Sequence, residues 1–375
     1  MSSPRSYNVL QVLPELDAGG VERTTVEVAE ALSAAGHRAF VVSGGGRLVP
    51  ELLDAGGTHF TAQIGSKRLL SFPWRVAAIR KLIVLNQIDV VHARSRAPAW
   101  AAWRAAIAEG VPFVTTYHGI YNEGFPGKRR YNSIMARGDL VIANSRFTAD
   151  HIMAVHGTPE RRIRIIPRGV DMDVFDPETV SSARITAMRR HWGIEDGQTV
   201  ILLPARLTRW KGQTVAVRAL AQMHKDAVLV CIGDPQGRDA YVGELRKLAQ
   251  ELGVGDRLRL PGHETDMPAA LLAADIVTTP STDPEAFGRT AAEAQAMGRW
   301  VVASAHGGAV DVVEGGLTGA LVSPGDVRAL AQALEDVPSG YDSGAARERI
   351  AARFSKRALQ DATLSAYRDL LARRA

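Results

Sequence analysis

Short apolar runs recur along the chain, and polar segments with helix-favouring composition separate most of them. Residues 7–13 form the first strand-like run, Gly19 and Gly20 break the chain, and residues 21–35 have the pattern of a helix. Residues 38–43 then form a second apolar run. This order predicts a strand, helix, strand unit, which is the building block of a parallel sheet.

The pattern continues in two series of apolar runs, each ending in small or polar residues. We expect these runs to be strands at residues 88–92, 113–117, 140–143 and 163–166 in the first series, and at 199–203, 228–232, 258–260, 276–279 and 300–303 in the second. The segment between the series, residues 167–177, has two prolines, one glycine and no regular period, which indicates a joint between domains. Because 375 residues exceed a typical single core, the sequence predicts an α/β fold of two Rossmann-like, doubly wound domains.

The composition is typical of a globular enzyme. Hydrophobic residues make up 46% and charged residues 23%, and no apolar stretch approaches the roughly 20 residues of a membrane span. The apolar run near the start is too short and too interrupted for a signal peptide, so we expect a cytoplasmic chain. Its single cysteine, Cys231, lies inside an apolar run, which favours a buried strand residue over a nucleophile.

Positive charge is concentrated in the first half of the chain. Residues 1–177 contain 21 Lys and Arg against 16 Asp and Glu, whereas residues 178–375 contain 24 of each. Segment 66–85 mixes Phe72 and Trp74 with these cations, a composition that suits a helix on an anionic bilayer and equally a helix packed on its own sheet. A basic chain also fits nucleic acid, but no readout motif accompanies the charge, so we expect no nucleic-acid partner.

Two carboxylates stand eight positions apart in segment 283–298, which carries the most specific chemistry of the sequence. The preceding run, 273–281, has the pattern of a buried strand, and loops after such strands bind ligands in open α/β sheets. Glu285 falls on this loop, and Glu293 falls in the helix that follows. The helix start leaves free backbone N–H groups from Gly288 to Thr290, which suit a phosphate. Alone, two glutamates at this spacing would also fit a solvated helix face.

Together with three other motifs, this segment resembles glycosyltransferase family 4, a group of retaining enzymes with the GT-B fold that use nucleotide-activated sugars. The four matches lie in order along nearly the whole chain, from residue 7 to about 370. They are the Gly19-Gly20 loop, the linker 168–171 followed by Phe175 and Pro177, the segment from Arg206 to Lys211 and Gly212, and the pair Glu285 and Glu293.

The resemblance implies two domains that face each other across a cleft. We expect an N-terminal, acceptor-binding domain over residues 1–170 and a C-terminal domain that binds the nucleotide sugar over residues 171–353. Residues 354–375 would form a helix that crosses back to the first domain, and closure about residues 167–177 would exclude water from the activated sugar. The implied partners are a nucleoside diphosphate sugar and a glycan or glycolipid acceptor.

The resemblance also implies which residues are catalytic. Arg206 and Lys211 would meet the diphosphate, where cations stabilise the charge that develops on the leaving group. Glu285 would hydrogen-bond the donor sugar, and Glu293 would accept the ribose hydroxyls. His118, which lies between a strand end and a glycine, would contact the donor sugar as a neutral imidazole.

Further donor contacts are expected at Gly19, Gly20, Gly233, Asp234, Glu264, Ala286, Phe287, Gly288, Arg289 and Thr290. Asp234 could equally cap the segment that follows it. Arg94 and Arg96 are candidate acceptor contacts, and surface charge is the alternative for both. We expect no metal or other cofactor, because the acidic pair Asp171 and Asp173 lies in the joint rather than at a nucleotide loop.

No residue stands out as a covalent nucleophile, so the expected reaction is a front-side displacement in which the departing phosphate helps to deprotonate the acceptor. The basic first domain makes a lipid-linked or cell-envelope glycan, such as a lipopolysaccharide core, the expected acceptor, with the enzyme peripheral on the inner face of the cytoplasmic membrane. Other activities stay open on this fold. They are a nucleotide-sugar epimerase, a phosphorylase, and a catalytically silent module that binds nucleotide sugars.

Overall fold

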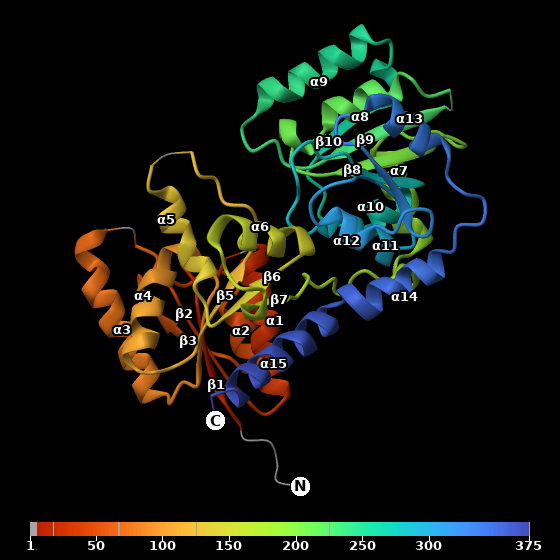
Figure 1. Cartoon of the computed structure of the whole chain (residues 1–375). Coiled ribbons are helices and arrows are strands. Elements are labelled where there is room, and N and C mark those ends of the chain that lie inside the picture. The colour runs from red at the N-terminus through yellow and green to blue at the C-terminus, as the bar shows by residue number, and fades with distance from the viewer. Residues whose placement is uncertain (1–5, 18, 67, 125, 225, 375) are drawn as a thin grey trace. The chain divides into compact units, whose positions relative to one another are not determined.

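The computed structural model describes residues 6–17, 19–66, 68–124, 126–224 and 226–374, and Figure 1 labels most of their helices and strands. The chain forms two compact units. Unit 1 comprises the chain up to Gly169 together with the chain from Lys356 onward, and unit 2 comprises Val170–Ser355. The chain therefore leaves unit 1 within segment 167–177 and returns to it near its end.

Unit 1 contains a parallel sheet of seven strands in the order β3-β2-β1-β4-β5-β6-β7. Its strands are β1 (Asn8–Val12), β2 (Arg38–Ser43), β3 (Thr58–Thr61), β4 (Val90–Ala93), β5 (Phe113–Tyr117), β6 (Leu140–Ala143) and β7 (Ile163–Ile165). Its helices are α1 (Gly20–Ala34), α2 (Val49–Asp54), α3 (Phe72–Leu85), α4 (Arg96–Ala108), α5 (Lys128–Asn132), α6 (Arg146–His156) and α15 (Lys356–Ala372). The central strands β4, β5 and β6 are buried along their whole length and are mostly apolar, as a parallel sheet covered on both faces requires.

Helices cover both faces of this sheet. On one face, Val9 and Val41 pack with residues of α1, α2 and α15. On the other face, Leu10 and Phe40 pack with residues of α3, α4 and α6. Neighbouring residues of a strand thus enter different cores, which is the alternation expected of an extended chain.

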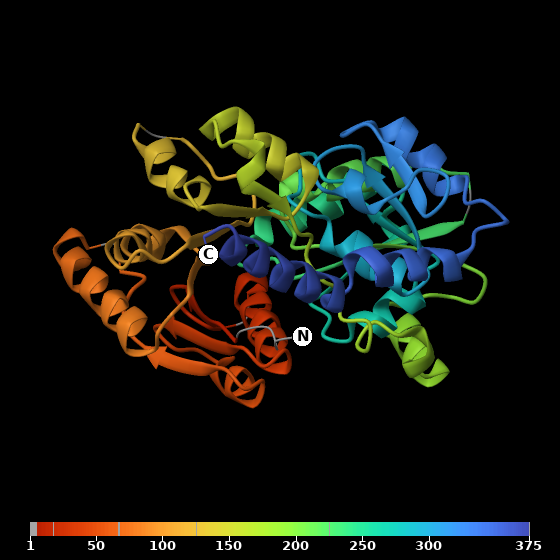
Figure 2. The same ribbon diagram turned by 60° about the horizontal axis from the view of Figure 1, so that its bottom comes forward.

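Helix α15 completes unit 1, where it lies against α1 (Figure 2). Its buried residues Leu359, Tyr367 and Leu370 recur at helical spacing and join the core. The hydroxyl of Tyr367 lies 2.6 Å from Nδ1 of His92, whose Nε2 lies 2.7 Å from Oγ1 of Thr116. The end of the chain is therefore part of the core of the unit in which the chain begins.

Unit 2 contains a parallel sheet of six strands in the order β10-β9-β8-β11-β12-β13. Its strands are β8 (Thr199–Pro204), β9 (Ala227–Ile232), β10 (Leu258–Gly262), β11 (Ile276–Thr279), β12 (Trp300–Ser304) and β13 (Gly319–Val322). Its helices are α7 (Ser182–His191), α8 (Gln213–Leu220), α9 (Asp239–Glu251), α10 (Met267–Ala273), α11 (Arg289–Ala296), α12 (Ala309–Val312), α13 (Val327–Glu335) and α14 (Ser343–Phe354). Cys231 is fully buried in β9, as its apolar neighbours predicted.

Each sheet reverses its strand order at one place, its switch point. In unit 1 the switch point lies between β1 and β4, and in unit 2 it lies between β8 and β11. The connections that leave two neighbouring strands there run to opposite faces of the sheet, which opens a crevice at the carboxyl ends of the strands. This crevice is the usual ligand site of open α/β sheets.

The two doubly wound sheets confirm the predicted fold class. The structure adds strands β3 and β13, which the apolar pattern did not predict, and each lies at the edge of its sheet. The terminal segment, expected as one helix, instead holds the last residue of α14, Phe354, and then α15. No helix within the described ranges combines the length and the apolar character that crossing a membrane demands.

Candidate functional site

The loops that follow β8 and β11 bring Lys211 and Glu285 together. Lys211 ends a short 3-10 turn after β8, and Glu285 lies on the loop after β11. Nζ of Lys211 is 2.8 Å from Oε1 of Glu285, and Oγ of Ser281 donates a hydrogen bond of 2.6 Å to the same oxygen. The two charged side chains are 13% and 19% exposed. Two sequence motifs thus form one half-buried ion pair at the switch point of unit 2.

A glycine lets these two loops approach each other. Gly212 has a φ of +77°, and a Cβ at this position would overlap the carbonyl oxygen of Pro280. Next to it, the N–H of Thr282 donates to the carbonyl of Trp210 at 2.7 Å. The Lys211 ammonium lies 4.4 Å from the centre of the Trp210 ring. These contacts hold Lys211 in place beside the second loop.

The loop after β12 supports the backbone of Glu285, and sequence reasoning missed this loop. The N–H of Gly308 donates to the carbonyl of Glu285 at 2.7 Å, and Nε2 of His306 lies 2.8 Å from the carbonyl of Ser281. A Cβ at Gly307 would overlap backbone atoms of Glu285. The signal was the run His306-Gly307-Gly308 after an apolar strand, because glycines at such a place often permit a close backbone approach.

Helix α11 starts at Arg289 with Gly288 as its N-cap, and it carries Glu293 in its second turn. The Glu293 side chain is 17% exposed, and Oε1 lies 3.9 Å from Nε of Arg289, which is too far for a hydrogen bond. Burial raises the pKa of Glu293 to about 7, and the Arg289 charge offsets only part of this effect. The carboxylate accepts no hydrogen bond from the described residues, so both of its oxygens can accept hydrogen bonds from a ligand.

The other polar residues of these loops differ in their availability. The Arg206 side chain is exposed and, within the described parts of the chain, forms no hydrogen bond or ion pair. Arg209, by contrast, pairs with Glu244 at 2.7 Å on the surface. Oγ1 of Thr290 donates to the carbonyl of Pro204, at the end of β8, at 3.3 Å. Arg206 is therefore the more available of the two arginines beside Lys211.

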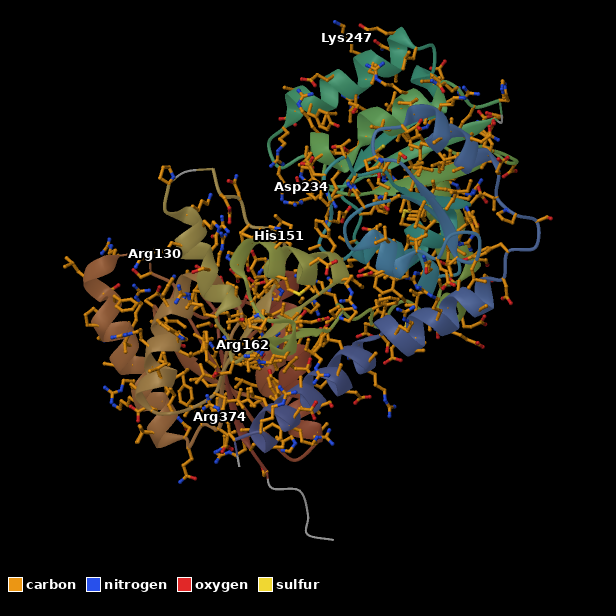
Figure 3. All side chains as sticks on the ribbon, in the orientation of Figure 1. Arg130, His151, Arg162, Asp234, Lys247 and Arg374 are labelled. Atoms are coloured by element: carbon orange, nitrogen blue, oxygen red, sulfur yellow. The ribbon has the colours of Figure 1, made fainter. Side chains whose placement is uncertain are left out.

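Asp234 and Glu264, two carboxylates expected as donor contacts, each accept a hydrogen bond within unit 2. Oδ1 of Asp234 accepts a hydrogen bond of 2.7 Å from the N–H of Gln236, so this exposed residue (Figure 3) caps the turn after β9. Oε1 of Glu264 accepts a hydrogen bond of 3.0 Å from Nε1 of Trp192 and lies 3.3 Å from Nε2 of His191. The Glu264 carboxylate thus ties the loop after β10 to the end of α7, and its contact with the donor stays a prediction.

Several other expected donor contacts depend on the backbone. The Phe287 side chain is 3% exposed and packs against Phe354, with ring centres 5.8 Å apart. Only the backbone of Phe287, between Ala286 and Gly288, is left to face a ligand. The N–H of Gly233, after β9, is bound to the carbonyl of Gly262 at 2.7 Å.

The acidic pair of the linker caps its own turn. Oδ1 of Asp171 accepts a hydrogen bond of 3.1 Å from the N–H of Asp173. Of the residues that the structure describes, no group of three or more His, Cys, Asp or Glu is placed to hold a metal ion. Asp171 therefore has a local structural task in the segment that connects the units.

His118 follows β5 in unit 1, and its contact with Arg168 determines which ring nitrogen carries the proton. Nη2 of Arg168 lies 3.3 Å from Nδ1 of His118. Because an arginine only donates, Nδ1 accepts this hydrogen bond and the proton of the neutral ring is on Nε2. Burial, and then the charges of Arg168 and Arg94, hold the pKa of His118 well below its usual range. Gly20, the first residue of α1 after its N-cap Gly19, lies against the same Arg168 guanidinium.

Arg94 is placed differently from the expectation for an acceptor contact. Its side chain is buried, and its Nε and Nη2 donate to Oε1 of Gln11 at 2.8 and 2.6 Å. Arg94 therefore links the end of β4 to β1 inside the sheet. Arg96, the first residue of α4, stays partly exposed. Its Nη1 donates to Oδ1 of Asn132 at 2.8 Å, and its guanidinium lies 4.2 Å from the centre of the Tyr121 ring.

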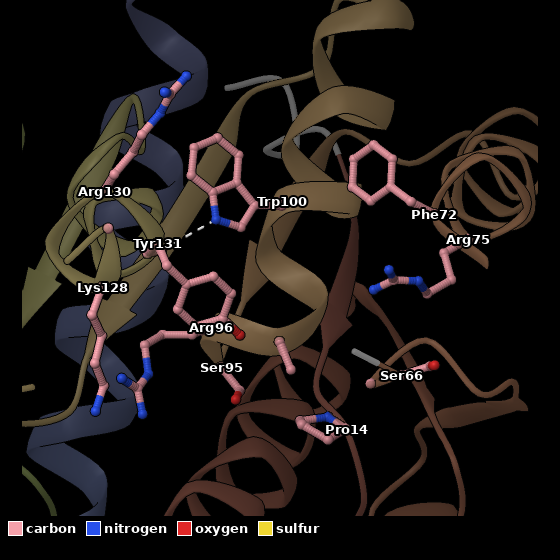
Figure 4. A pocket seen from close by; sticks show the side chains of 13 residues that line it. Pro14, Ser66, Phe72, Arg75, Ser95, Arg96, Trp100, Lys128, Arg130 and Tyr131 are labelled. Atoms are coloured by element: carbon pink, nitrogen blue, oxygen red, sulfur yellow. Dashed lines mark hydrogen bonds between the residues drawn. The ribbon is translucent and has the colours of Figure 1, made fainter. Parts of the chain in front are cut away.

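A pocket of about 1030 Å³ opens at the switch point of unit 1 (Figure 4). Its walls come from the loops after β1, β3 and β4, from the first turns of α3 and α4, and from α5. Phe72 and Trp100 supply aromatic surface. No acidic residue is among its described lining residues, whereas four are cationic: Arg75, Arg96, Lys128 and Arg130.

Comparison with known proteins matches both halves of the chain to family models. The model Glycosyltransferase Family 4 matches residues 18–174, and the model Glycosyl transferases group 1 matches residues 184–357. Among solved structures, a glycosyltransferase from Rickettsia africae is 34% identical with a TM-score of 0.89, over 98% of this chain and 99% of that chain. HepE from Anabaena, in complex with UDP and glucose, is 25% identical with a TM-score of 0.78, over 96% of this chain and 98% of that chain.

A curated relative has a longer chain. D-inositol 3-phosphate glycosyltransferase from Xylanimonas cellulosilytica is 36% identical over 261 residues. The match covers 66% of this chain and 62% of that relative, so the chain spans about three fifths of the relative's length. The likeness to the Rickettsia africae structure nevertheless covers 98% of this chain and therefore includes both units.

Proposed function

The chain belongs to the glycosyltransferases of the family 4, group 1 type, and from this premise we propose that it transfers a hexose from a nucleoside diphosphate sugar to an acceptor hydroxyl with retention of anomeric configuration. The observation that carries the proposal is the ion pair of Lys211 and Glu285 at the switch point of unit 2. The same segment continues into α11, whose amino end has no side-chain cap and which carries Glu293. A cation, free backbone N–H groups and two carboxylates are the groups that a diphosphate, a hexose and a ribose require.

In this proposal the donor binds unit 2. Arg206 and Lys211 hold the diphosphate together with the N–H groups from Gly288 to Thr290. Glu285 accepts a hydrogen bond from a hydroxyl of the hexose, and Glu293 accepts hydrogen bonds from the hydroxyls of the ribose. Structures of the Anabaena protein HepE contain UDP or UDP-glucose, which supports a uridine nucleotide as the first donor to test.

The proposed reaction is a front-side displacement. The bond between the anomeric carbon and the diphosphate oxygen breaks, and the acceptor oxygen bonds to the same carbon on the same face. The acceptor proton passes to the departing diphosphate, so the scheme consumes no protein base. Lys211 and Arg206 stabilise the charge that builds up on the leaving oxygen, and Nε2–H of His118 donates to a hydroxyl of the transferred sugar. No metal or other cofactor takes part in this scheme.

The acceptor in this proposal is a lipid-linked or cell-envelope glycan, such as a lipopolysaccharide core. Helix α3 supports this part, because Trp74, Val84 and Leu85 are 54%, 58% and 67% exposed. They share the helix with the exposed cations Arg80 and Lys81, and such a surface suits an anionic bilayer. Co-sedimentation with anionic vesicles tests it. If the protein binds these vesicles, and both added salt and a Trp74→Ser change weaken the binding, the result supports a membrane-bound acceptor. If the protein does not bind them at low salt, the membrane is removed from the proposal.

The decisive experiment is a panel of UDP-, GDP- and ADP-sugars tested for binding and slow hydrolysis with a chelator present. Wild type, Glu293→Ala and His118→Ala are measured in parallel. We expect one preferred donor, bound about tenfold more weakly by Glu293→Ala and hydrolysed more slowly by His118→Ala. A wild type that binds no nucleotide sugar contradicts the proposal.

Product analysis separates the other activities. An epimerase would convert the sugar while it stays on its nucleotide, and a silent module would bind the donor without hydrolysis or transfer. The anomeric configuration of the product, measured by NMR, tests retention directly.

A further inference from the structure

The pocket of unit 1 contains a buried guanidinium without a counter-ion. Arg75, in the first turn of α3, is 4% exposed. Its Nη1 and Nη2 donate only to the carbonyls of Ile64 and Arg68, at 3.4 and 3.3 Å, and its Nε has no hydrogen-bond partner among the described residues. No described carboxylate forms an ion pair with it. Burial lowers the pKa of Arg75, but a guanidinium remains charged at neutral pH.

Such a charge is costly unless something binds it. A buried cation loses its hydration. Long hydrogen bonds to two carbonyls and the Phe72 ring, whose centre lies 5.5 Å from Cζ of Arg75, replace that hydration only in part. In Figure 4 the guanidinium of Arg75 points toward the middle of the pocket, and the charged ends of Arg96 and Lys128 lie on its other side. An anion in the pocket would therefore supply the missing counter-charge.

The amino end of α4 adds backbone donors to the same pocket. Its N-cap Ser95 and its first residue Arg96 line the pocket, and no side chain caps the helix. The N–H groups of a first helical turn have no partner within the helix, and the helix dipole there attracts negative charge. This feature and the unpaired Arg75 are independent, since they come from different helices.

The remaining surface of the pocket is aromatic. Phe72 and Trp100 line it, and the Trp100 ring is held because its Nε1 donates to the carbonyl of Tyr131 at 3.1 Å. Aromatic faces suit the apolar face of a sugar or polyol ring. The volume of about 1030 Å³ is at the upper end of the roughly 300–1000 Å³ of small-molecule sites, so it has room for more than one ring.

We propose that this pocket is the acceptor site and that it selects an acceptor whose hydroxylated ring carries a phosphate, bound by Arg75, Arg96 and the amino end of α4. The role as acceptor site rests on the proposed function, whereas anion recognition by Arg75 does not. The ligand chemistry is a phosphate ester on a sugar or polyol, either free in solution or as the headgroup of a glycolipid.

Calorimetry on the full chain tests the proposal with pairs of probes that differ only in the phosphate. The pairs are inositol 3-phosphate with inositol, and glucose 6-phosphate with glucose. We expect the phosphorylated member of at least one pair to bind roughly tenfold or more tightly. Arg75→Gln and Arg96→Gln should each reduce this preference about tenfold. The matched control is Arg104→Gln, an exposed arginine of α4 that is not among the lining residues of the pocket, and it should keep the preference.

Equal binding of both members of each pair overturns the proposal, and so does an undiminished preference in both Arg75→Gln and Arg96→Gln. Because Arg75 is buried, its variant is first checked by thermal unfolding, and the partly exposed Arg96 keeps the test valid if that variant does not fold. Vesicles containing phosphatidylinositol, compared with vesicles of phosphatidylcholine alone, separate the two sources of the phosphate. Arg75-dependent binding to either the free or the vesicle-borne probe supports the proposal.

Donor hydrolysis in the same samples separates this inference from the proposed function. A protein that binds the phosphorylated probe through Arg75 but binds no nucleotide sugar refutes the proposed function and retains the anion site. A wild type that hydrolyses its donor but shows no preference for the phosphorylated probe refutes this inference alone.

Discussion

The ammonium of Lys211 and the carboxylate of Glu285 form a half-buried ion pair at 2.8 Å, on loops that leave two different strands. The pair exists because β8 and β11 are neighbours in the sheet although β9 and β10 lie between them in the sequence. A diphosphate that enters this site would compete with Glu285 for the Lys211 cation, which would release the carboxylate toward a sugar hydroxyl.

Loss of either partner should therefore impair transfer rather than folding. We expect Lys211→Met and Glu285→Gln each to lower kcat/KM for the donor by about a hundredfold, because one loses the charge at the leaving group and the other the contact to the sugar. Arg209→Met is the control, because Arg209 is a nearby cation that pairs with Glu244 on the surface. Its kcat/KM should stay within about twofold of the wild-type value. Steady-state kinetics with a saturating acceptor measure this, and near-normal rates in the first two variants would remove the pair from catalysis.

Nucleotide binding should depend on pH through Glu293. Its pKa is raised to about 7 by burial, so in the free protein roughly a tenth of it is ionised at pH 6 and most of it at pH 8. If the ionised carboxylate accepts hydrogen bonds from the ribose hydroxyls, the affinity for UDP should rise about tenfold from pH 6 to pH 8 and then level off. The Glu293→Gln variant should bind UDP more weakly and lack this rise. It also serves as the control for the diphosphate, whose own titration would change affinity equally in both proteins.

The same shift has a consequence for stability with a defined sign. A carboxyl group whose pKa is higher in the folded protein than in the unfolded chain favours folding at low pH, and this contribution is lost as the pH rises through about 7. Glu293→Gln should therefore gain stability relative to wild type above pH 7, measured by denaturant unfolding with no nucleotide present. A gain that is independent of pH between 5 and 8 would contradict the assignment.

Gly212 should not tolerate a side chain. Its φ of +77° alone makes alanine unfavourable by about 1 kcal/mol, and a Cβ would in addition overlap the carbonyl oxygen of Pro280. We expect Gly212→Ala to cost more than about 2 kcal/mol of unfolding free energy and to displace Lys211. Gly237→Ala is the matched control, because Gly237 has a φ of +74° with open space around its Cβ position. Equal losses in the two variants would show that the loop contact is unimportant.

The terminal helix should be necessary for unit 1. Tyr367→Phe removes the hydroxyl that lies 2.6 Å from Nδ1 of His92 and leaves a buried nitrogen unpaired, which should cost about 1–3 kcal/mol. Tyr131→Phe, at a more exposed tyrosine, should change stability by less than about 0.5 kcal/mol. Urea unfolding measures both. Deletion of residues 354–375 should lower the melting temperature and abolish activity, and unchanged values would show that α15 is dispensable.

The apolar pattern predicted the central strands well because parallel strands covered on both faces are buried and therefore mostly apolar. It missed β3 and β13, whose sequences, Thr58–Thr61 and Gly319–Val322, are short and only partly buried. Residues 58–61 hold one apolar residue, Phe60, and residues 319–322 form an apolar run of only four residues that begins with a glycine, so neither segment stands out in the local pattern. Pairing with β2 and β12, which no local pattern encodes, makes these segments strands.

The candidate site was predictable as a set of loops but not as a set of contacts. Glu285 and Lys211 were expected at the ends of strands, yet only the strand order brings them together. Arg94 has the same sequence context as an accessible residue, and its burial follows from Gln11 on the neighbouring strand β1. Arg75 is one of several cations in segment 66–85, and only the packing of α3 shows that it is buried beside a pocket.

The return of the chain to unit 1 at Lys356 sets an order on synthesis. A ribosome delivers the chain from its amino end, so the first sheet and all of unit 2 emerge before α15 exists. Until then, the sheet face that contains Val9, Val41 and Ile142 lacks the cover that Tyr367 later provides. The unit that is begun first is therefore completed last, and in the nascent protein its open apolar face is a target for chaperones and a hazard for aggregation.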